Sequence, residues 1–512
     1  MLSATDSAIL ACDLGTTGAK VSLVAFDGCV LASHYTRYKT YYPFPDWAEQ
    51  NPQDWISSFV DGTKIVLEKS SLPPTNISAV AFSGHMHGCV PVDRCGSPLT
   101  DRAILWADRR SSEEARNAIA RFGWERFYSL TGAGLEVSLY PLAKINWIRT
   151  HAEDVYKKAH KFLGTKDVLV AWLTGLLVTD PSEASDTGMF DLSQRCWARD
   201  LLDTAHIDLA KLPDVLPSTT VVGGITHSSA AATGLLEGTP VVLGAGDVTC
   251  AALGAGMVAD GQAYCCLGSA SWVAFASQQP LMDSDTRPFV LCHAVPDMYL
   301  SQLATYSAGV VVEWMLDEIF SDGDGSSGSS VTYDDLMSLA ASSPPGANEL
   351  LCLPYLRPGG APSYDPSERG ILYGMQLSHQ RADVVRAVLE GITYSIRKLV
   401  YTFDKQRVSD LPLLRLIGGG ANSPFWAQLI ADMIAKPVET LEVKQEANTV
   451  GAAVIGMVAE AVYDTFQQAA DACVRSEQIA EPSTQIQSDY QAIIHRYQRL
   501  DDEMRNLQGR LM

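Results

Sequence analysis

The chain lacks long hydrophobic runs and an excess of basic residues, and both absences narrow what it can do. No uninterrupted apolar stretch reaches the roughly 18 residues that a membrane-spanning helix requires. Asp and Glu number 59 against 38 Lys and Arg, which gives a net charge of −21 at pH 7. This balance argues against binding to nucleic acid or to anionic lipid, because both need a basic surface. It does not exclude binding a nucleotide, since backbone amides and a metal ion can hold phosphate in an acidic protein.

The cysteines and the N-terminus indicate the compartment. The 11 cysteines are scattered without zinc-binding spacing, and the adjacent pair Cys265-Cys266 suits buried thiols better than a disulfide. The first residues, Met1 to Ser7, carry no positive charge and no apolar core, unlike a signal peptide. We therefore expect a protein of the reducing cytoplasm, without a membrane partner.

A Gly/Thr turn near the N-terminus is the first candidate site. An apolar run carries Asp13 to its end, the turn Gly15-Thr16-Thr17-Gly18 follows, and a second apolar run closes on Asp27-Gly28 as in a hairpin. Backbone amides in such a turn suit phosphate oxygens, and a carboxylate suits Mg²⁺. The chain has no Walker motif, and a strand instead of a helix is predicted to follow, unlike a Rossmann fingerprint. The pattern alone leaves two interpretations, an ordinary hairpin and a phosphate grip.

A second informative stretch, residues 240–256, predicts a short buried strand, a Gly-rich corner, Asp247 and a helix of small residues that can pack closely on a neighbouring backbone. Residues 262–275 then repeat the opening pattern around the turn Gly268-Ser269, which suggests a second domain built like the first. We expect an N-terminal domain over residues 1–250 and a C-terminal domain over residues 251–512.

Other segments complete the predicted architecture. The aromatic motif from Asp46 to Trp55 is interpreted as a loop pinned by its aromatic residues, leading into a helix. The Ser/Gly-rich segment 321–330 is predicted to be a flexible insertion without chemistry. Hydrophobic periodicity and capping signals predict helices over residues 52–68, 381–403, 424–435 and 446–458, strands over 77–82 and 413–417, a mainly helical region over 139–180, and a largely helical tail from Glu477.

A third small-residue turn, Gly418-Gly419-Gly420, follows the predicted strand 413–417. The three turns at strand ends, together with the strand-end carboxylates Asp13 and Asp247, resemble the actin-like ATPase superfold. The resemblance implies an α/β fold in which two RNase-H-like domains close an interdomain cleft over a nucleotide. Along nearly its full length the chain is similar to the FGGY carbohydrate kinases, and most similar to their xylulokinase branch. The motifs that match in order and spacing are Asp13-Leu-Gly-Thr-Thr-Gly18, Met86-His87-Gly88, Ile104-Leu-Trp106-Ala-Asp108, Gly244-Ala-Gly-Asp247, Leu267-Gly268-Ser269, Leu353-Pro-Tyr355 and Gly418-Gly-Gly-Ala421.

This resemblance implies a catalytic role for Asp247 and a metal-binding role for Asp13. Asp247 would be the general base that accepts the proton of the sugar's terminal hydroxyl as it attacks the γ-phosphate of ATP. An alternative is that Asp247 only caps the following helix, and both roles are compatible. Asp13 would orient Mg²⁺ through water.

The resemblance also implies which residues bind the nucleotide. Gly15, Thr16 and Thr17 would hold the phosphates, with Lys20 assisting unless it is only a solvated strand residue. Asn422 would face the adenosine, or would serve only as a turn residue that tolerates a left-handed conformation. The remaining predicted contacts are Gly268 and Ser269 to phosphate and Gly419 and Gly420 to adenosine.

The sugar would contact Met86, His87, Trp106 and Asp108. In an extended segment His85 and His87 point to the same side and Met86 to the other, although a turn flanked by glycine would break that alternation. A histidine at a strand end is usually structural. The match of Met86-His87-Gly88 to the family favours a sugar-binding role for His87 but not for His85.

Departures from the xylulokinase pattern leave the sugar open. Val248 stands where xylulokinases usually have Asn, Arg357-Pro-Gly-Gly-Ala-Pro362 replaces a Gly-Glu-Arg-Thr-Pro loop, and Ala270 removes one hydroxyl from the second turn. The expected reaction is ATP- and Mg²⁺-dependent phosphorylation of a ketopentose, with D-xylulose to D-xylulose 5-phosphate as the leading case. Ribulose, another ketose, gluconate and glycerol are the alternatives, and a catalytically inactive sugar or nucleotide sensor is an alternative of another class. A homodimer is left open by the sequence.

Overall fold

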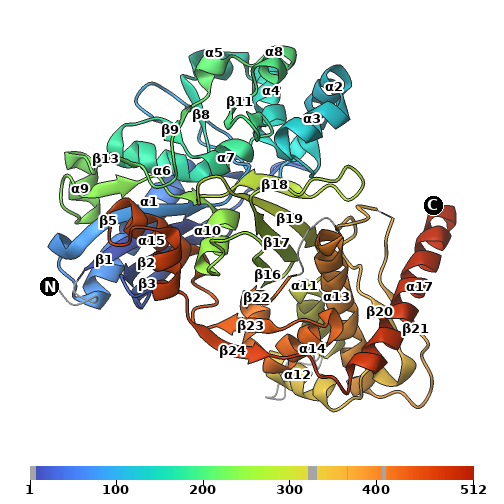
Figure 1. The fold of residues 1–512 in the computed structure, drawn as a ribbon. Helices are drawn as coiled ribbons and strands as arrows, with labels where there is room; N and C mark the ends of the chain where they lie inside the picture. Colours follow the sequence, from blue (N-terminus) through green and yellow to red (C-terminus); the bar gives the residue numbers. More distant parts are fainter. Residues whose placement is uncertain (1–6, 321–330, 366, 406–410, 512) are drawn as a thin grey trace. The chain divides into compact units, whose positions relative to one another are not determined.

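The computed structural model describes residues 7–320, 331–365, 367–405 and 411–511, so the predicted insertion 321–330 lies outside the described residues. The chain divides into two compact units, and each is assembled from separate stretches of sequence (Figure 1). The division into domains 1–250 and 251–512 stays a prediction. Unit 1 comprises Met1–Asp260, Ala276–Ser301 and Glu446–Arg475, and unit 2 comprises Gly261–Phe275, Gln302–Gln445 and Ser476–Met512.

A mixed sheet forms the centre of unit 1. Its strand order is β13-β14-β5-β1-β2-β3, with β15 also paired to β5. β1 runs antiparallel to β2, which confirms the predicted opening hairpin, and parallel to β5. The strands are β1 (Ala8–Leu14), β2 (Gly18–Ala25), β3 (Val30–Arg37), β5 (Ile77–Gly84), β13 (Val221–Gly224), β14 (Pro240–Val242) and β15 (Ala245–Gly246).

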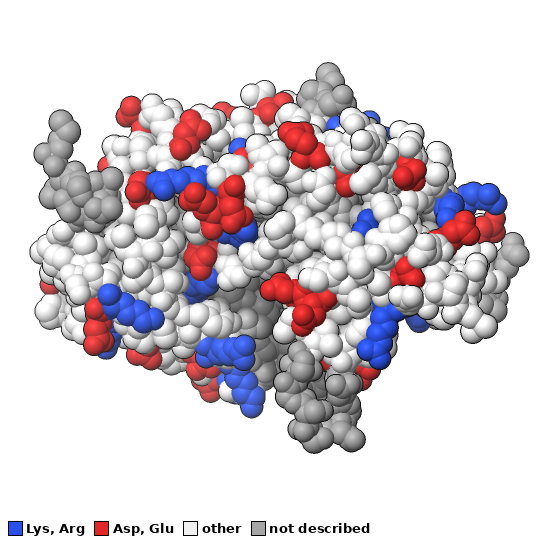
Figure 2. All heavy atoms as spheres, turned by 90° about the horizontal axis from the view of Figure 1, so that it is seen from below, with Lys and Arg blue, Asp and Glu red and all other residues white. Residues whose placement is uncertain are grey.

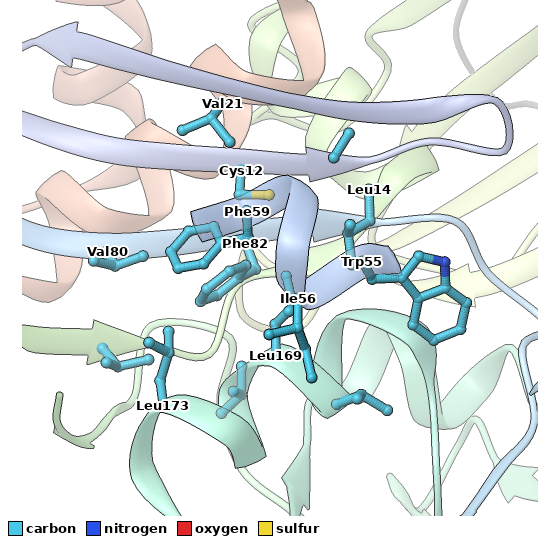
Figure 3. Packing of buried hydrophobic residues seen from close by; sticks show 14 of the residues in the cluster. Cys12, Leu14, Val21, Trp55, Ile56, Phe59, Val80, Phe82, Leu169 and Leu173 are labelled. Atoms are coloured by element: carbon cyan, nitrogen blue, oxygen red, sulfur yellow. The ribbon is translucent and has the colours of Figure 1, made fainter. Parts of the chain in front are cut away.

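Helices α1 (Pro52–Ser70) and α6 (Thr165–Thr174) pack on one face of this sheet (Figure 3). α1 begins where the Asn51 side chain accepts a hydrogen bond from the amide of Gln53 at 3.0 Å, and Pro52 occupies the first helical position. Burying each large apolar side chain there contributes about 1.5–3 kcal/mol. The labelled core residues are Cys12, Leu14, Val21, Trp55, Ile56, Phe59, Val80, Phe82, Leu169 and Leu173.

The opposite face of β1 carries the odd-numbered residues, because side chains alternate along a strand. Helix α15 (Ala447–Ala459) covers this face, and its Gly456 lies against Ile9. Asp13 therefore belongs to the face covered by α15, not to the face covered by α1. The predicted helix 446–458 is confirmed, and it supplies a neighbour to β1 from more than 400 residues away in the sequence.

Helix α10 (Asp247–Gly254) packs closely on α15, as its small residues predicted. A Cβ atom built on Gly254 would lie 1.9 Å from the carbonyl oxygen of Ala447, and one built on Gly451 would lie 1.8 Å from that of Cys250. Backbone meets backbone at both points, so neither position has room for a side chain.

Unit 2 repeats the opening topology. β16 (Ala263–Leu267) and β17 (Ser271–Ser277) form an antiparallel hairpin, and β22 (Leu414–Ile417) runs parallel to β16 as β5 does to β1. β23 (Val438–Leu441) is parallel to β22. The second predicted hairpin is thus confirmed.

The predicted helical tail from Glu477 is wrong in its first part. Ser476–Ala480 is strand β24, antiparallel to β23, and only α17 (Gln487–Leu511) is helical. The polar segment becomes a strand because it forms hydrogen bonds with the otherwise open edge of β23. The Glu477 carboxylate also forms an ion pair with the ammonium of Lys444.

The remaining predicted elements are present with small shifts. In unit 2 these are α13 (Arg381–Asp404) and α14 (Pro424–Ile434), the latter capped by the Ser423 hydroxyl, which accepts from the amide of Trp426 at 3.2 Å. The region 139–180 contains α4 (Pro141–His151), α5 (Glu153–Lys158) and α6, with the short strands β8 (Lys161–Leu163) and β9 (Val178–Thr179) between and after them.

Charge and hydropathy of the folded chain agree with the composition. Acidic and basic side chains are interspersed among uncharged residues on the face in Figure 2. Among the described residues, no helix combines the length and apolarity needed to cross a lipid bilayer.

Candidate active site

Three neighbouring strands of unit 1 bring two carboxylates to one edge of the sheet. In register across β1, β5 and β15, Asp13 is opposite Ser83 and Ser83 is opposite Ala245. These strands are parallel, so their carboxyl ends meet at the same edge, where open α/β sheets bind ligands. Asp247 follows β15 directly and begins α10. The fold therefore gathers Asp13 and Asp247 from opposite ends of a stretch of more than 200 residues.

The carboxylate of Asp13 is held by two neutral donors. Its Oδ1 atom accepts from the Ser83 hydroxyl at 2.7 Å and from the Asn448 amide at 3.2 Å. Burial raises the pKa of Asp13, while these hydrogen bonds and the charge of Lys20 act to lower it. The Nζ atom of Lys20 lies 3.5 Å from the Glu446 carboxylate, so Lys20 is not a purely solvated strand residue.

The pKa of Asp247 is strongly raised at this edge of the sheet. Burial, and then the negative charge of Asp13, raises the pKa of Asp247 to about 8. Gly246 is the N-cap residue, so Asp247 occupies the first helical position, and its Oδ1 accepts from the amide of Val248 at 2.8 Å. Asp247 thus combines a helix-terminal hydrogen bond with a carboxyl group of raised proton affinity.

A buried relay that the sequence analysis did not identify fixes the start of α10. Lys166 is fully buried, and its ammonium lies 3.0 Å from Oδ1 of Asp180. Oδ2 of Asp180 accepts from the Ser182 hydroxyl at 2.6 Å, and Oγ of Ser182 accepts from the amide of Gly246 at 2.9 Å. These residues set the position of the backbone that carries Asp247. The sequence signal was only a Lys-Asp pair before an apolar run, which is too common to be assigned a role.

The Gly/Thr turn between β1 and β2 directs all four of its carbonyl oxygens to partners within unit 1. Within the described residues, the amides of Thr16 and Thr17 have no hydrogen-bond partner. Protein donors thus satisfy the carbonyl oxygens of the turn, while the amides of Thr16 and Thr17 remain available to a ligand. The carbonyl of Gly15 accepts from the Tyr38 hydroxyl, that of Thr16 from Gln50 Nε2 at 2.6 Å, that of Thr17 from the amide of Tyr38 at 3.3 Å and that of Gly18 from the amide of Gly15 at 3.0 Å.

His87 is held in an unusual conformation by one carboxylate. Its φ is +61°, so the extended alternation does not apply, and its amide donates to the Asp186 carboxylate. The Nδ1 atom of His87 lies 3.0 Å from Oδ1 of Asp186, and the ring packs 4.8 Å from that of Tyr140. Asp186 was missed because nothing in its sequence context connects it with His87.

His85 and Met86, which precede His87 in the chain, are buried and pack against other parts of unit 1. His85 packs against Trp55, and burial lowers the pKa of His85 to about 3, which keeps it neutral. Met86 is 4% exposed and lies against Gly246, where an added Cβ would come within 2.7 Å of the sulfur. Met86 therefore touches the corner that carries Asp247.

Trp106 and Asp108 lie on the segment after β7 (Ala103–Ile104) and have different surroundings. Trp106 is 43% exposed, and its indole Nε1 donates to the Thr16 hydroxyl at 2.9 Å. Asp108 is fully buried, and its carboxylate accepts from the amide of Ala48 at 2.7 Å and from Arg110 at 2.6 Å. Trp106 is thus accessible to a ligand, while the carboxylate of Asp108 holds its own loop.

In unit 2 the two predicted turns follow neighbouring parallel strands. Cys266 on β16 is opposite Ile417 on β22, so the turns that begin at Gly268 and Gly418 lie at the same edge. The carbonyl of Gly268 accepts from the amide of Gly309 at 2.9 Å, and the Ser269 hydroxyl lies 3.3 Å from Glu313. Gly418 has a φ of +88°, a conformation that side-chain-bearing residues rarely adopt.

The residues after Gly418 leave open space. Among the described residues, apart from its chain neighbours, none has an atom within 4 Å of a Cβ built on Gly419, whereas one on Gly420 would lie 2.4 Å from Leu267. Asn422 is exposed at the end of this turn. The turn after Gly418 therefore offers accessible backbone at the carboxyl end of the unit 2 sheet.

Two repeated α/β units, each with a small-residue turn at the ends of parallel strands, have the architecture of the actin-like ATPase superfold. Two family models then identify the family. The N-terminal domain of the FGGY family of carbohydrate kinases matches residues 8–254, and the C-terminal domain of that family matches residues 263–460. The chain belongs to the FGGY family of carbohydrate kinases, and it is a sugar kinase.

Individual relatives agree with this family. The chain is 30% identical to a xylulose kinase of Staphylococcus epidermidis over 98% of both chains. It is 29% identical to a gluconokinase of Bacillus subtilis over 91% of this chain and 90% of the relative. The solved structure of a ligand-bound xylulose kinase from Lactobacillus acidophilus superposes with a TM-score of 0.89 at 24% identity, covering 99% of this chain and 100% of that one, which shows a common fold.

Proposed function

We propose that the chain transfers the γ-phosphate of ATP to the terminal hydroxyl of a ketopentose, with D-xylulose to D-xylulose 5-phosphate as the preferred reaction. The xylulose kinase relative supports this choice, because the similarity extends over 98% of both chains. We place the enzyme in the cytoplasm, in keeping with its 11 free thiols.

The observation that carries the proposal is the raised pKa of Asp247 beside Asp13 at the sheet edge. A carboxylate of raised pKa accepts a proton more readily than an ordinary one, which suits a general base. Asp247 takes the proton of the sugar hydroxyl while that oxygen attacks the γ-phosphorus, and the bond to the β-phosphate oxygen breaks to release ADP. The Lys166–Asp180–Ser182 relay keeps the backbone of Asp247 in place during the step.

The donor set at this edge fits Mg²⁺. Asp13 and Asp247 are carboxyl groups at the same sheet edge, and the charge of Asp13 raises the pKa of Asp247, so a cation bound beside them would favour their ionised forms. Mg²⁺ is commonly bound by one or two carboxylates together with substrate phosphates and water. Asp13, oriented by Ser83 and Asn448, would hold the ion, which when bound supplies charge neutralisation for the phosphates.

The proposal names candidate nucleotide contacts in each unit separately. In unit 1, Gly15, Thr16 and Thr17 bind phosphate oxygens through the amides of the turn, and Lys20 adds positive charge. In unit 2, Gly268 and Ser269 bind phosphate, while Gly419, Gly420 and Asn422 border the adenosine. Backbone amides suit this task because they hold phosphate without a compensating cation.

The sugar is assigned to Met86, His87 and Trp106. The exposed indole of Trp106 suits the apolar carbon face of a sugar, and His87 offers a ring nitrogen fixed by Asp186. Asp108 enters the proposal as a residue that positions the Trp106 loop, because its carboxylate is already occupied by Arg110 and Ala48. The contact proposed at Val248 is apolar.

Gluconate is the second candidate substrate. The gluconokinase relative is nearly as similar to this chain as the xylulose kinase relative. Val248 also lacks the amide with which xylulokinases usually meet their sugar. A difference of one contact is enough to change which substrate is preferred, because an unpaired hydroxyl costs binding energy.

Measuring ADP release with a panel of ketopentoses, sugar acids, polyols and aldoses tests the proposal. We expect the highest kcat/KM with D-xylulose. Preference for gluconate with no stimulation by xylulose would reject the ketopentose and keep the kinase. No stimulation by any compound, with ATP still bound, would favour the catalytically inactive sensor.

A further inference from the structure

The aromatic motif between Asp46 and Trp55 contains a buried glutamine that contacts the phosphate turn. Gln50 belongs to the short strand β4 (Glu49–Gln50) and is fully buried. Its Nε2 atom donates to the carbonyl of Thr16 at 2.6 Å and to the Thr40 hydroxyl at 2.8 Å. None of the roles assigned above accounts for this residue.

The orientation of the Gln50 amide group is determined by Trp55. The indole nitrogen of Trp55 can only donate, and it lies 2.9 Å from Oε1 of Gln50. The NH₂ group must therefore face Thr16 and Thr40, and both of its protons are used. Trp55 is itself fully buried in the core of unit 1, so the arrangement is rigid.

Fixing a carbonyl also fixes the next amide, because the peptide bond is planar and trans. The N–H of Thr17 shares its peptide plane with the carbonyl of Thr16 and points the opposite way. The same relation joins the N–H of Thr16 to the carbonyl of Gly15, which accepts from the Tyr38 hydroxyl. Each anchor thus aims one of the two amides that have no partner within the described residues.

We propose that Gln50 and Tyr38 are positioning residues for phosphate binding, which orient the amides of Thr17 and Thr16 before the nucleotide arrives. This inference rests on the proposed function, in which the turn binds the phosphates of ATP. Preorganised donors avoid the entropy cost of ordering the turn at the moment of binding. Neither residue needs to touch the nucleotide.

Two variants test the inference separately. Gln50→Leu removes the donor to Thr16 with little change in volume, and Tyr38→Phe removes only the hydroxyl that holds Gly15. We expect each variant to raise the KM for ATP and the Kd for ADP by about tenfold, with the sugar KM changed less than about twofold. A merely structural role would lower the yield of active protein or change both KM values together.

Thr63→Val is the matched control. Thr63 is a fully buried polar residue of the adjacent helix α1, and its hydroxyl bonds the carbonyl of Phe59 at 2.7 Å, away from the turn. It should leave the KM for ATP unchanged. If Gln50→Leu does not fold, Tyr38→Phe decides, since it retains the ring.

The outcomes separate this inference from the proposed function. Unchanged ADP affinity in both variants, with a wild-type enzyme that binds ADP and turns over, would overturn the positioning role alone. A wild-type protein that binds no ADP and phosphorylates no sugar would instead overturn the proposed function.

Discussion

The Nζ atom of Lys144 lies 2.7 Å from the carbonyl oxygen of His87 and 2.7 Å from that of Leu105. Lys144 is fully buried on α4, and burial lowers the pKa of Lys144 to about 8. His87 and Leu105 belong to the two segments that carry the proposed sugar contacts. One buried cation therefore joins both walls of the proposed sugar site.

Replacing Lys144 by Met should affect the sugar more than the nucleotide. Met fills a similar volume but leaves two buried carbonyls without a donor, so the His87 and Leu105 segments lose their common anchor. We expect the sugar KM to rise about tenfold with the KM for ATP nearly unchanged, measured by steady-state kinetics. Lys161→Met is the control, because Lys161 also bonds two backbone carbonyls, those of Ala210 and Leu212 at 3.0 and 2.7 Å, which belong to neither segment. Equal changes in the two variants would contradict the assignment.

Asp247→Ala should abolish sugar-dependent turnover while ATP still binds. Removing a general base costs about 10²- to 10⁴-fold in kcat, and the phosphate turns are not touched. Asp247→Asn keeps the shape and should lose as much. Rapid-quench measurement of ADP formation, with calorimetric titration of nucleotide, gives both quantities. A variant with near-normal turnover would remove Asp247 from the base role.

The pKa of Asp247 predicts how stability depends on pH in the protein without metal or nucleotide. Its ordinary pKa is 3.8 and its folded pKa is about 8, so between these values the folded state retains a proton that the unfolded state has lost. Stability therefore falls as pH rises from about 4 to about 8. Asp247→Asn should remove this loss and exceed the wild type by several kcal/mol at pH 8, since each unit of pKa shift corresponds to about 1.4 kcal/mol. Urea titrations at pH 5 and pH 8 measure the free energy of unfolding of the wild type and of Asp247→Asn. The same stability difference between the two proteins at both pH values would contradict the raised pKa.

The contact between α10 and α15 predicts two sensitive glycines. Gly254→Ala and Gly451→Ala each place a methyl group within 2 Å of a backbone carbonyl, at 1.9 and 1.8 Å. Backbone must move, and we expect each to lower the free energy of unfolding by about 2 kcal/mol or more in denaturant titrations. Gly223→Ala serves for comparison, since its added Cβ meets only ordinary contacts at 3.7 Å. Equal stability of all three variants would refute the close packing.

Local sequence was sufficient for the elements and for the turns at their ends. The hairpins around Gly15-Thr16-Thr17-Gly18 and Gly268-Ser269 follow from apolar runs broken by small residues, and α14 follows from Ser423 and Pro424. The strand β24 could not be predicted from local sequence, because Ser476–Ala480 is polar and becomes a strand only by pairing with β23. A pairing partner nearly 40 residues away leaves no local signal.

The sequence by itself determined the family, the repeated architecture and the candidate residues Asp13 and Asp247, because these depend on short motifs and their order. Only the tertiary structure decided what holds those residues. Asn448 reaches Asp13, Asp186 holds His87, Lys144 ties His87 to Leu105, and Gln50 anchors Thr16. Such partners are supplied by neighbouring strands and helices, and spatial proximity between distant segments is a property of the packed fold that no local pattern encodes.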